Sequence, residues 1–269
     1  MFSNPRIGLQ NHGDTCYINA CLQIFLACHT TRHHVEAATF SMPSLAKLFK
    51  RISCTRAPYV SPLEFIYTLP MEYHPCSGQH DAAEMLLHIL SNVADSHVQR
   101  TFAHAITVHT KCKGCDAAST IASNDFIFAL TASSTVRTIE EEVVSSQMPH
   151  LFERVCETCA CPSSTQTITL LPSGVLLIQI KRFSYNMLTG VTSKLYEVVR
   201  ISHRLTFASV PYELRVVLLH SGDFSSGHYI VDVLDTTGER LSISDHTTEP
   251  IPHARPSNVT PYVLMYVRL

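Results

Sequence analysis

One cysteine, Cys16, lies where its thiol could act as a nucleophile. A run of turn-forming residues, Asn11 to Thr15, precedes it, and from Tyr17 onward apolar residues recur at helical spacing. This pattern predicts a helix whose N-terminus is at Cys16. The free backbone N–H groups and the dipole at such a terminus stabilise a thiolate, so we expect a lowered pKa for Cys16. The alternative is a small buried hydrophobic residue, the common role of a free cysteine.

Asn11, five residues before Cys16, could assist that nucleophile. Its amide can donate a hydrogen bond to the oxyanion that forms when a thiolate attacks a carbonyl carbon. A thiolate that attacks an amide also needs a base, and histidine suits this task near neutral pH. The chain has 16 histidines, so the base must be chosen from its surroundings.

His228 is the histidine whose surroundings fit a base best. It ends a glycine-containing loop and precedes an expected strand, Tyr229 to Leu234, which places its ring at an exposed loop-to-strand edge. His220 competes with it, but it ends an expected strand and is better explained as a structural residue. Asp245 is expected on the strand after the turn at 236–239, where hairpin pairing brings it beside His228. An acid there would fix the tautomer and the angle of the ring.

The residues from Gly8 to Gln23, GLQNHGDTCYINACLQ, resemble the cysteine box of the ubiquitin-specific proteases, a family of papain-like deubiquitinases. They match the pattern GLxNxGNTCYxNxxLQ at every fixed position except Asp14, which replaces an asparagine. The stretch HSGDFSSGHY resembles the family's histidine box, which makes His228 the choice for the base. The offset from His228 to Asp245 fits the family's third catalytic residue, and His246 replaces the second acid that many members carry next to it.

Asp14 bears on Cys16 only if its carboxylate faces the sulfur, because a nearby negative charge would raise the thiol pKa. We expect instead that Asp14 accepts backbone N–H bonds within the turn, as asparagine would.

A second stretch, Gln79 to Val93, predicts an amphipathic helix. Its apolar stripe is formed by Ala82, Met85, Leu86, Ile89 and Val93. Asp81 and Glu84 fall near the helix start, where the dipole favours acids, and the residues alone describe a well-capped core helix. The letters QHDAAE also resemble a box of the same family whose two acids contact the basic C-terminal tail of ubiquitin. The resemblance implies that role for Asp81 and Glu84.

Two cysteine pairs, Cys112 with Cys115 and Cys156 with Cys159, share the C-x-x-C spacing. Two such knuckles can place four thiolates around one tetrahedral zinc ion, whereas a redox pair needs no second pair. Cys161 follows closely and could substitute as a ligand. In the family that the chain resembles, such a site joins the tips of the "fingers" subdomain, so the resemblance implies one structural Zn²⁺.

The remaining elements are expected to be short helices and β-strands. Helical patterns lie at 44–52, at 62–69 and around 138–146, and strands are expected between Thr101 and Leu130, including 105–108 and 125–128, and at 174–183, 212–220 and 262–266. The resemblance covers essentially the whole chain and implies an α+β, papain-like fold with thumb, palm and fingers. We expect a helical thumb at about 1–100, zinc-bearing fingers at 101–170 and a β-rich palm at 171–269.

Length and composition bound the class of protein. With 269 residues, 45% of them hydrophobic, the chain can bury a sizeable core. A formal net charge of −2 without a basic cluster does not indicate nucleic acid or an anionic membrane as partner. No apolar stretch is long enough to span a membrane, and the N-terminus lacks a signal-peptide core, which favours free thiols over disulfides. We expect a single soluble, monomeric catalytic domain without adaptor domains, in the cytoplasm, the nucleus or both.

The expected function is hydrolysis of the isopeptide bond after the C-terminal glycine of ubiquitin, with ubiquitin and ubiquitinated proteins as partners. Cys16 would attack the carbonyl, Asn11 would hold the oxyanion, and His228, oriented by Asp245, would shuttle the proton. Two alternatives remain: a catalytically silent ubiquitin-binding module, and a protease for another ubiquitin-like modifier. A zinc hydrolase is excluded, because the sequence has no His/Glu cluster with the spacing of an open zinc site.

Overall fold

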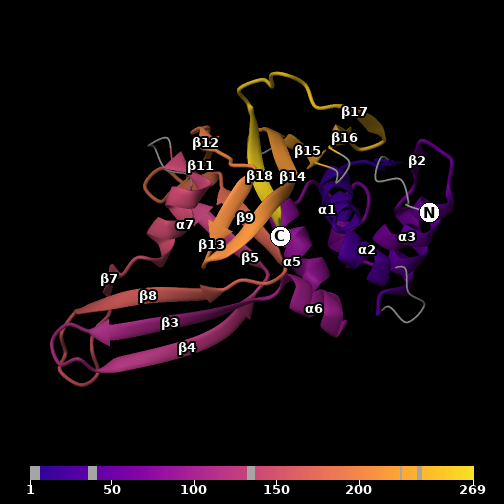
Figure 1. Cartoon of the computed structure of the whole chain (residues 1–269). Helices are drawn as coiled ribbons and strands as arrows, with labels where there is room; N and C mark the ends of the chain where they lie inside the picture. The colour runs from indigo at the N-terminus through magenta and orange to yellow at the C-terminus, as the bar shows by residue number, and fades with distance from the viewer. Residues whose placement is uncertain (1–6, 36–40, 132–136, 225, 235–237) are drawn as a thin grey trace.

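The structure is a computed structural model that describes residues 7–35, 41–131, 137–224, 226–234 and 238–269. Figure 1 shows most helices on one side of a central twisted sheet, from which a second, narrower sheet extends away. The helices of the described residues are α1 (Cys16–Ala27), α2 (His29–Val35), α3 (Pro43–Cys54), α4 (Leu63–Ile66), α5 (Ala82–Asn92), α6 (Ser96–Phe102) and α7 (Ile139–Gln147), with a 3-10 turn at Met71–Tyr73. None of these helices is long and apolar enough to cross a membrane.

Helix α1 begins at Cys16, as the sequence pattern predicts, and lies inside the molecule. Every residue from Cys16 to Leu26 is buried. A helix that is buried on all sides needs packing partners on all sides, and α1 packs against α2, α5 and the strands β14 and β15 of the central sheet. The position of the Cys16 backbone is therefore fixed by the core.

Helix α5 confirms the helix predicted from Gln79 to Val93, although it begins later, at Ala82. Asp81 sets this start, because its side chain accepts hydrogen bonds from the backbone N–H groups of Ala83 at 2.7 Å and Glu84 at 3.1 Å. The predicted apolar stripe is buried as a whole: Ala82, Met85, Leu86, Ile89 and Val93.

The other predicted helices are also confirmed. The patterns at 44–52 and 62–69 correspond to α3 and the shorter α4, and the pattern around 138–146 corresponds to α7. Helix α7 begins with a capping box, in which the Thr138 side chain accepts from the N–H of Glu141 and the Glu141 side chain accepts from the N–H of Thr138.

Eight strands of the described residues form the central sheet, in the order β17-β16-β15-β14-β18-β9-β5, with β13 paired to β14. Their bounds are β5 (Ile127–Thr131), β9 (Val175–Lys181), β13 (Arg204–Phe207), β14 (Val210–Gly222), β15 (Gly227–Leu234), β16 (Arg240–Ser244), β17 (Thr247–Pro250) and β18 (Val259–Arg268). The strands predicted at 174–183, 212–220 and 262–266 are the central β9, β14 and β18.

Strand β9 is buried on both faces of this sheet. Val175 and Leu177 belong to the apolar cluster that contains α1 and α5, whereas Leu176 and Ile178 belong to a second cluster that contains α7. A strand covered on both faces needs apolar residues at every position, not at alternate ones. This two-sided burial explains why the first four residues of β9, VLLI, are all apolar.

The second sheet contains the two cysteine pairs at its far end. Its order is β4-β3-β8-β7, with bounds β3 (His104–Cys112), β4 (Ala118–Asp125), β7 (His150–Glu153) and β8 (Ser163–Leu171). The alternating stretch expected as one strand at 125–128 is divided here. Asp125 ends β4, and its carboxylate accepts from the N–H of Phe126 at 2.7 Å, which turns the chain before β5 begins at Ile127.

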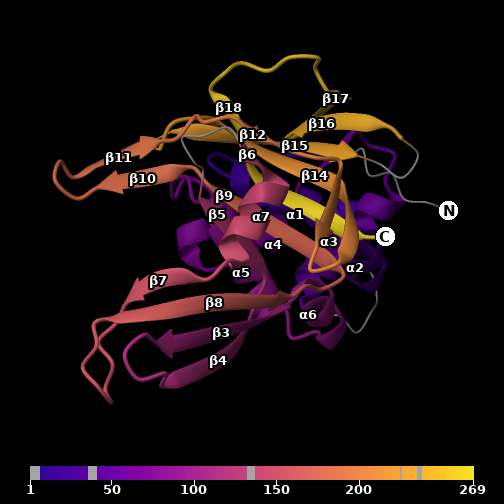
Figure 2. The same cartoon turned by 60° about the vertical axis from the view of Figure 1, so that its left-hand side comes forward.

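Three two-stranded pairs complete the described strands. They are β1 (Gly8–Leu9) with β2 (Tyr59–Val60), β6 (Arg137–Thr138) with β12 (Val199–Arg200), and β10 (Phe183–Asn186) with β11 (Val191–Lys194). The β10–β11 hairpin projects from the body in Figure 2. The β1–β2 pair matters for the site, because it leads the chain directly into Asn11 and Cys16.

The buried ring of His104 at the base of the second sheet predicts a loss of stability in acid. Its side chain is fully buried, Nδ1 accepts from the N–H of Ser173 at 3.2 Å, and burial lowers the pKa of His104 to about 4. Between about pH 6.5 and about pH 4 the unfolded chain therefore binds a proton that the folded chain excludes, so stability falls as the pH falls through this window.

The expected loss from His104 is on the order of 3 kcal/mol. Urea unfolding between about pH 7 and about pH 4.5 measures it, and His104→Gln should reduce the pH dependence. His220, also buried with a pKa lowered to about 4, should keep part of the dependence in that variant. An equal loss in wild type and His104→Gln would contradict this account.

Candidate active site and metal site

Cys16, the first residue of α1, is only 3% exposed, and its surroundings correct the sequence-based expectation of a lowered pKa. The pKa of the Cys16 thiol is raised, chiefly because burial disfavours the thiolate. The backbone N–H groups of Tyr229, Tyr17 and Cys16 lower it, as a helix N-terminus should, while the negative charge of Asp245 raises it further. Burial outweighs the amides, so the free protein holds a neutral thiol.

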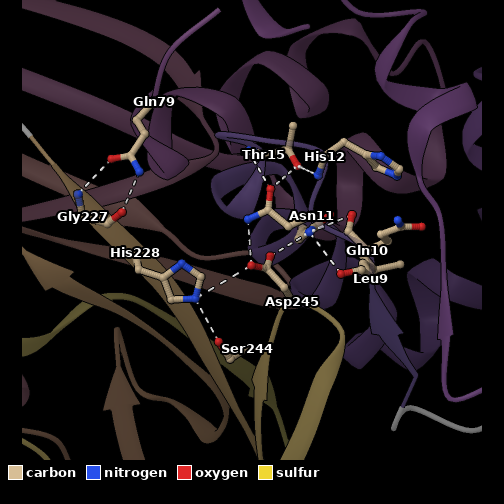
Figure 3. A network of polar contacts seen from close by, with 11 residues as sticks. Leu9, Gln10, Asn11, His12, Thr15, Gln79, Gly227, His228, Ser244 and Asp245 are labelled. Carbon is tan, nitrogen blue, oxygen red and sulfur yellow. Dashed lines mark hydrogen bonds and ion pairs between the residues drawn. The ribbon is translucent and has the colours of Figure 1, made fainter. Parts of the chain in front are cut away.

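Asn11 forms the centre of the turn that leads into α1 (Figure 3). Its side-chain oxygen accepts from the backbone N–H of Thr15 at 3.3 Å and from the Thr15 hydroxyl at 3.0 Å. Its side-chain nitrogen donates to Asp245 Oδ2 at 2.9 Å. The amide therefore joins the turn to Asp245 and still has a second N–H; donation to an oxyanion stays a prediction.

Asp14 does not have the contacts expected of it. Its side chain is exposed, and among the described residues its carboxylate accepts no hydrogen bond in the turn. That expectation was wrong because Asn11 and Thr15 already fill the role: Asn11 accepts from Thr15, and Thr15 Oγ1 accepts from the N–H of His12 at 3.0 Å.

Asp245 lies in the turn between β16 and β17, one residue beyond the strand on which the sequence placed it. Its φ of 51° is in the left-handed region, where aspartate is among the few tolerated residues. Asn19 on α1 donates to Asp245 Oδ1 at 2.8 Å, and the N–H of Leu9 donates to the Asp245 carbonyl at 2.7 Å. The β16–β17 turn thus packs against β1 and α1. Gly8 allows β1 to lie this close to the turn, since a Cβ on Gly8 would lie 2.5 Å from the backbone of His246.

His228 lies at the start of β15, at the loop-to-strand boundary that the sequence predicts. Its Nε2 lies 2.8 Å from Ser244 Oγ and 3.9 Å from Asp245 Oδ2 (Figure 3). The backbone N–H of the next residue, Tyr229, lowers the pKa of Cys16. Asn11 and Cys16 from the turn at the start of α1, His228 from β15 and Asp245 from the β16–β17 turn are thus brought together from three separate segments, although no hydrogen bond within the described residues joins Cys16 to His228.

Gln79 connects the loop before α5 to the strand that carries His228 (Figure 3). Its side-chain amide donates to the carbonyl of Gly227 at 2.7 Å and accepts from the N–H of Gly227 at 2.9 Å. This pair of hydrogen bonds fixes the residue immediately before His228 relative to the helical side of the site.

His220 is buried inside the sheet. Burial, the largest cause, and the charge of Lys194 lower its pKa to about 4, so its ring is neutral near pH 7. It packs so tightly that a Cβ on Gly227 would lie 2.2 Å from its Nε2. These surroundings are those of a structural histidine, as expected.

Asp81 and Glu84, the two acids of the QHDAAE box, differ in their surroundings. Both oxygens of Asp81 are engaged: Oδ1 caps α5, and Oδ2 accepts from the hydroxyl of Tyr262 on β18. Glu84 is exposed on the first turn of α5. The structure thus gives Asp81 a scaffold role and leaves the Glu84 carboxylate accessible.

The four cysteines predicted as ligands converge at the tip of the second sheet. The sulfur atoms of Cys112, Cys115, Cys156 and Cys159 all lie within 4.8 Å of one another. Cys112 Sγ lies 3.6 Å from Cys159 Sγ, and Cys115 Sγ lies 3.7 Å from Cys156 Sγ, distances that exclude disulfide bonds. Four thiols arranged in this way could hold a metal ion.

Cys161, the alternative ligand, lies outside this cluster. Its thiol points to the carbonyl of Ser163 at 3.6 Å, while its backbone carbonyl accepts from the N–H of Cys156 and closes the second knuckle. Gly114 makes the approach of the two knuckles possible, because a Cβ there would lie 2.8 Å from Cys161 Cβ and 3.0 Å from Cys159 Sγ.

Three residues of the site were not identified from the sequence: Asn19, Gln79 and Ser244. Asn19 is a fixed position of the cysteine box and Gln79 is the first residue of the QHDAAE box, so their place in these boxes is the signal that points to them. Ser244 has no such signal. Only the pairing of β15 with β16 and the turn after it reveal that its hydroxyl reaches His228.

Several curated proteins are similar to this chain in sequence. It is 25% identical over 288 residues to ubiquitin carboxyl-terminal hydrolase 48 of Gallus gallus, an alignment that covers 91% of this chain but only 28% of that protein. It is 26% identical over 267 residues to Ubl carboxyl-terminal hydrolase 18 of Mus musculus, covering 83% of this chain and 72% of that protein.

The fold of this chain resembles two solved structures of the SAGA DUB module with Ubp8, Sgf11, Sus1 and Sgf73. The one bound to ubiquitin aldehyde has a TM-score of 0.84 at 17% identity, and the one bound to monoubiquitin has a TM-score of 0.81 at 19% identity. Each alignment covers 99% of this chain and 70% of the other. This likeness confirms the α+β fold predicted from the sequence.

The sequence model of the family described as ubiquitin carboxyl-terminal hydrolase matches residues 7–266. The match includes the turn before α1, the strand that carries His228 and both cysteine pairs. The chain therefore belongs to the ubiquitin carboxyl-terminal hydrolase family, a family of cysteine proteases, as its three sequence boxes predict.

Proposed function

We propose that this chain is a deubiquitinase that hydrolyses the isopeptide bond after the C-terminal glycine of ubiquitin. One observation carries the proposal: three separate segments bring Asn11, Cys16, His228 and Asp245 to one place. Asn11 lies 2.9 Å from Asp245 and His228 lies 3.9 Å from Asp245, and the backbone N–H of Tyr229, next to His228, lowers the pKa of Cys16. A nucleophile, a base, an acid and an amide donor are the groups that thiol-dependent amide hydrolysis needs.

The state of the thiol assigns the first step to His228. Because burial raises the pKa of Cys16, the attacking thiolate has to be generated during the reaction. In our proposal His228 takes the proton and returns it to the leaving amine, while Asp245 favours the protonated ring. The N–H of Cys16 and the second N–H of Asn11 hold the oxyanion, and water then hydrolyses the thioester.

The exposed carboxylate of Glu84 supports a contact with the basic tail of ubiquitin. We propose that Glu84 provides the accessible charge of that contact. Asp81, whose carboxylate oxygens both accept hydrogen bonds, would hold α5 in place and add its negative charge. In this proposal Glu84 binds the ubiquitin tail directly, whereas Asp81 mainly positions α5.

We further propose that the four-cysteine cluster binds one structural Zn²⁺. Tetrahedral zinc with Zn–S distances of about 2.3 Å requires sulfur atoms about 3.8 Å apart. The two shortest separations, 3.6 and 3.7 Å, fit this geometry. Backbone N–H groups also favour thiolates here: that of Gly114 lies 3.2 Å from Cys112 Sγ and lowers the pKa of Cys112. The proposed division into thumb, fingers and palm places this site in the fingers.

A second candidate function is hydrolysis after a ubiquitin-like modifier. Sequence similarity supports this second function about as well as the first, because one similar protein is named a ubiquitin hydrolase and another a Ubl hydrolase, at nearly equal identities of 25% and 26%. The two functions share the chemistry and differ only in the modifier. Recognition of the modifier outside its tail would therefore decide between them.

The experiment that tests the function is reaction of the purified protein with ubiquitin that carries a cysteine-reactive C-terminal group. We expect a covalent adduct with wild type, none with Cys16→Ala, and full reaction with Cys54→Ala, a control at an exposed cysteine. Probes made from ubiquitin-like modifiers, run in parallel, separate the two candidates. Protein that binds ubiquitin but forms no adduct would be a silent binding module.

A further inference from the structure

The hydrogen bond of His228 at Nε2 is made with Ser244 and not with Asp245. Nε2 lies 2.8 Å from Ser244 Oγ, whereas Asp245 Oδ2 lies 3.9 Å away (Figure 3). A separation of 3.9 Å is too long for a hydrogen bond, although the charge still acts at that distance. In the part of the chain that the structure describes, Ser244 is therefore the direct partner of this ring nitrogen.

Asp245 is kept at this distance by other partners. Asn11 donates to its Oδ2 at 2.9 Å and Asn19 donates to its Oδ1 at 2.8 Å, so each carboxylate oxygen already accepts an amide hydrogen. Its backbone carbonyl accepts from the N–H of Leu9 at 2.7 Å. The carboxylate thus belongs to the framework between α1, β1 and the β16–β17 turn.

Strand geometry directs the Ser244 hydroxyl to the ring. In the antiparallel pair of β15 and β16, Val231 lies opposite Ile243. One further step places Ser244 opposite Ile230, and side chains alternate between the faces of a strand, so Ser244 shares its face with Ile230 and His228. The contact therefore arises from two paired strands.

We propose that Ser244 is a positioning residue for His228, an inference that rests on the function proposed above. The serine oxygen accepts the hydrogen on Nε2 and thereby leaves Nδ1 unprotonated, the form that can take a proton from a thiol. When the ring becomes protonated, the same oxygen still accepts from Nε2. Ser244 thus sets the ring angle and tautomer, and Asp245 supplies the negative charge 3.9 Å away.

The charged surroundings of the ring make this proposal measurable. Asp245 is the negative charge that faces it. His220 is the other nearby histidine that interacts electrostatically with His228, and it is neutral near pH 7 because its pKa is about 4. Cys16, whose pKa is raised, is also neutral in the free protein. The tautomer of the ring near pH 7 therefore reports the contacts of His228 itself, because His220 and Cys16 are both neutral there.

The first test observes the ring in the free protein and needs no turnover. Nitrogen NMR of labelled imidazoles, with the His228 signals assigned by their loss in His228→Ala, reports tautomer and protonation. We expect the Nε2-protonated tautomer in wild type, and in Ser244→Ala a mixture of the two neutral tautomers, because Nε2–H loses the oxygen that accepts its hydrogen bond. Ser244→Thr, which keeps the hydroxyl, should restore the wild-type tautomer.

The second test measures kinetics on a fluorogenic ubiquitin substrate. Because serine touches the ring and not the substrate, Ser244→Ala should lower kcat about tenfold with little change in KM. Ser244→Thr should recover most of the rate. The control Ser184→Ala, at an exposed serine of β10, should match wild type.

The outcomes separate this inference from the proposed function. A ring tautomer unchanged by Ser244→Ala would overturn the inference and leave Asp245 as the orienting group. A wild-type protein that is inert toward ubiquitin, but whose ring tautomer responds to Ser244→Ala, would contradict the proposed function and support the contact. A Nδ1-protonated ring in wild type would also overturn the inference.

Discussion

Replacing His228 with alanine is expected to lower kcat/KM toward a ubiquitin substrate by about 10²–10⁴-fold, the range that general acid–base catalysis contributes. The reason is the state of Cys16. Burial and the charge of Asp245 raise the pKa of this thiol, so at neutral pH little thiolate is present without a base. Enzymes whose cysteine already rests as a thiolate lose less at the attack step when the base is removed.

The residual activity of His228→Ala should depend on pH in a characteristic way. Without a base, the rate follows the fraction of thiolate, which rises about tenfold for each pH unit until the thiol pKa is reached. Wild type should be nearly independent of pH over the same alkaline range, because His228 removes the proton during the reaction. The ratio of the two rates should therefore shrink steadily as the pH is raised.

The control for this experiment is His253→Ala, which removes an exposed histidine from the segment before β18. Its rate should equal that of wild type at every pH. Thermal unfolding of both variants should stay close to wild type, because the His228 side chain is 37% exposed and contributes little to the core. A His228→Ala rate within about threefold of wild type near pH 7 would contradict its role as base.

The fold was predictable where local pattern and burial agree. The spacing of apolar residues already shows both helices, although α1 is buried on all sides and α5 on one face, and Asp81 marks the start of α5 by its capping chemistry. Strand β9 was predictable for a different reason. Its nearly continuous apolar run, VLLIQI, is characteristic of a strand covered on both faces, and the two clusters on either side of it provide that cover.

The sequence predicted four residues of the site, Asn11, Cys16, His228 and Asp245, but not the contacts that they make. Cys16 was placed correctly at the helix start, yet the sign of its pKa shift was wrong, because desolvation depends on how completely tertiary packing covers the sulfur. Asp245 was identified, but its place in a turn one residue beyond β16 follows from contacts with β1 and α1, more than 200 residues away in sequence. Such contacts have no local signal.

The second large effect is expected at the metal site. Cys156→Ser should reduce bound zinc from about one ion per chain to near zero, because removal of one of four thiolates opens a closed tetrahedral site. The second sheet should lose its order near the tip as a consequence. Every residue of β4 and β7 is exposed, so these strands bury little apolar surface of their own. A sheet with so small a core depends on the metal to hold its two knuckles together.

The matched control is Cys161→Ser, in the same loop as Cys156. Its thiol contacts the carbonyl of Ser163 and lies outside the four-sulfur cluster, so this variant should keep its zinc. Metal analysis of the purified proteins measures the first expectation. Hydrogen exchange measures the second: in Cys156→Ser, protection should fall in β3 and β8 but persist in β9, β14 and β18 of the central sheet.

The consequence for catalysis should be limited, because Figure 1 places the tip of the second sheet at the opposite end of the molecule from α1. Hydrolysis of a short peptide substrate that mimics the ubiquitin tail should be nearly unchanged in Cys156→Ser, whereas KM for whole ubiquitin should rise if the second sheet contacts the body of the modifier. Full zinc content in Cys156→Ser, or equal loss in Cys161→Ser, would show that the ligand set assigned here is wrong.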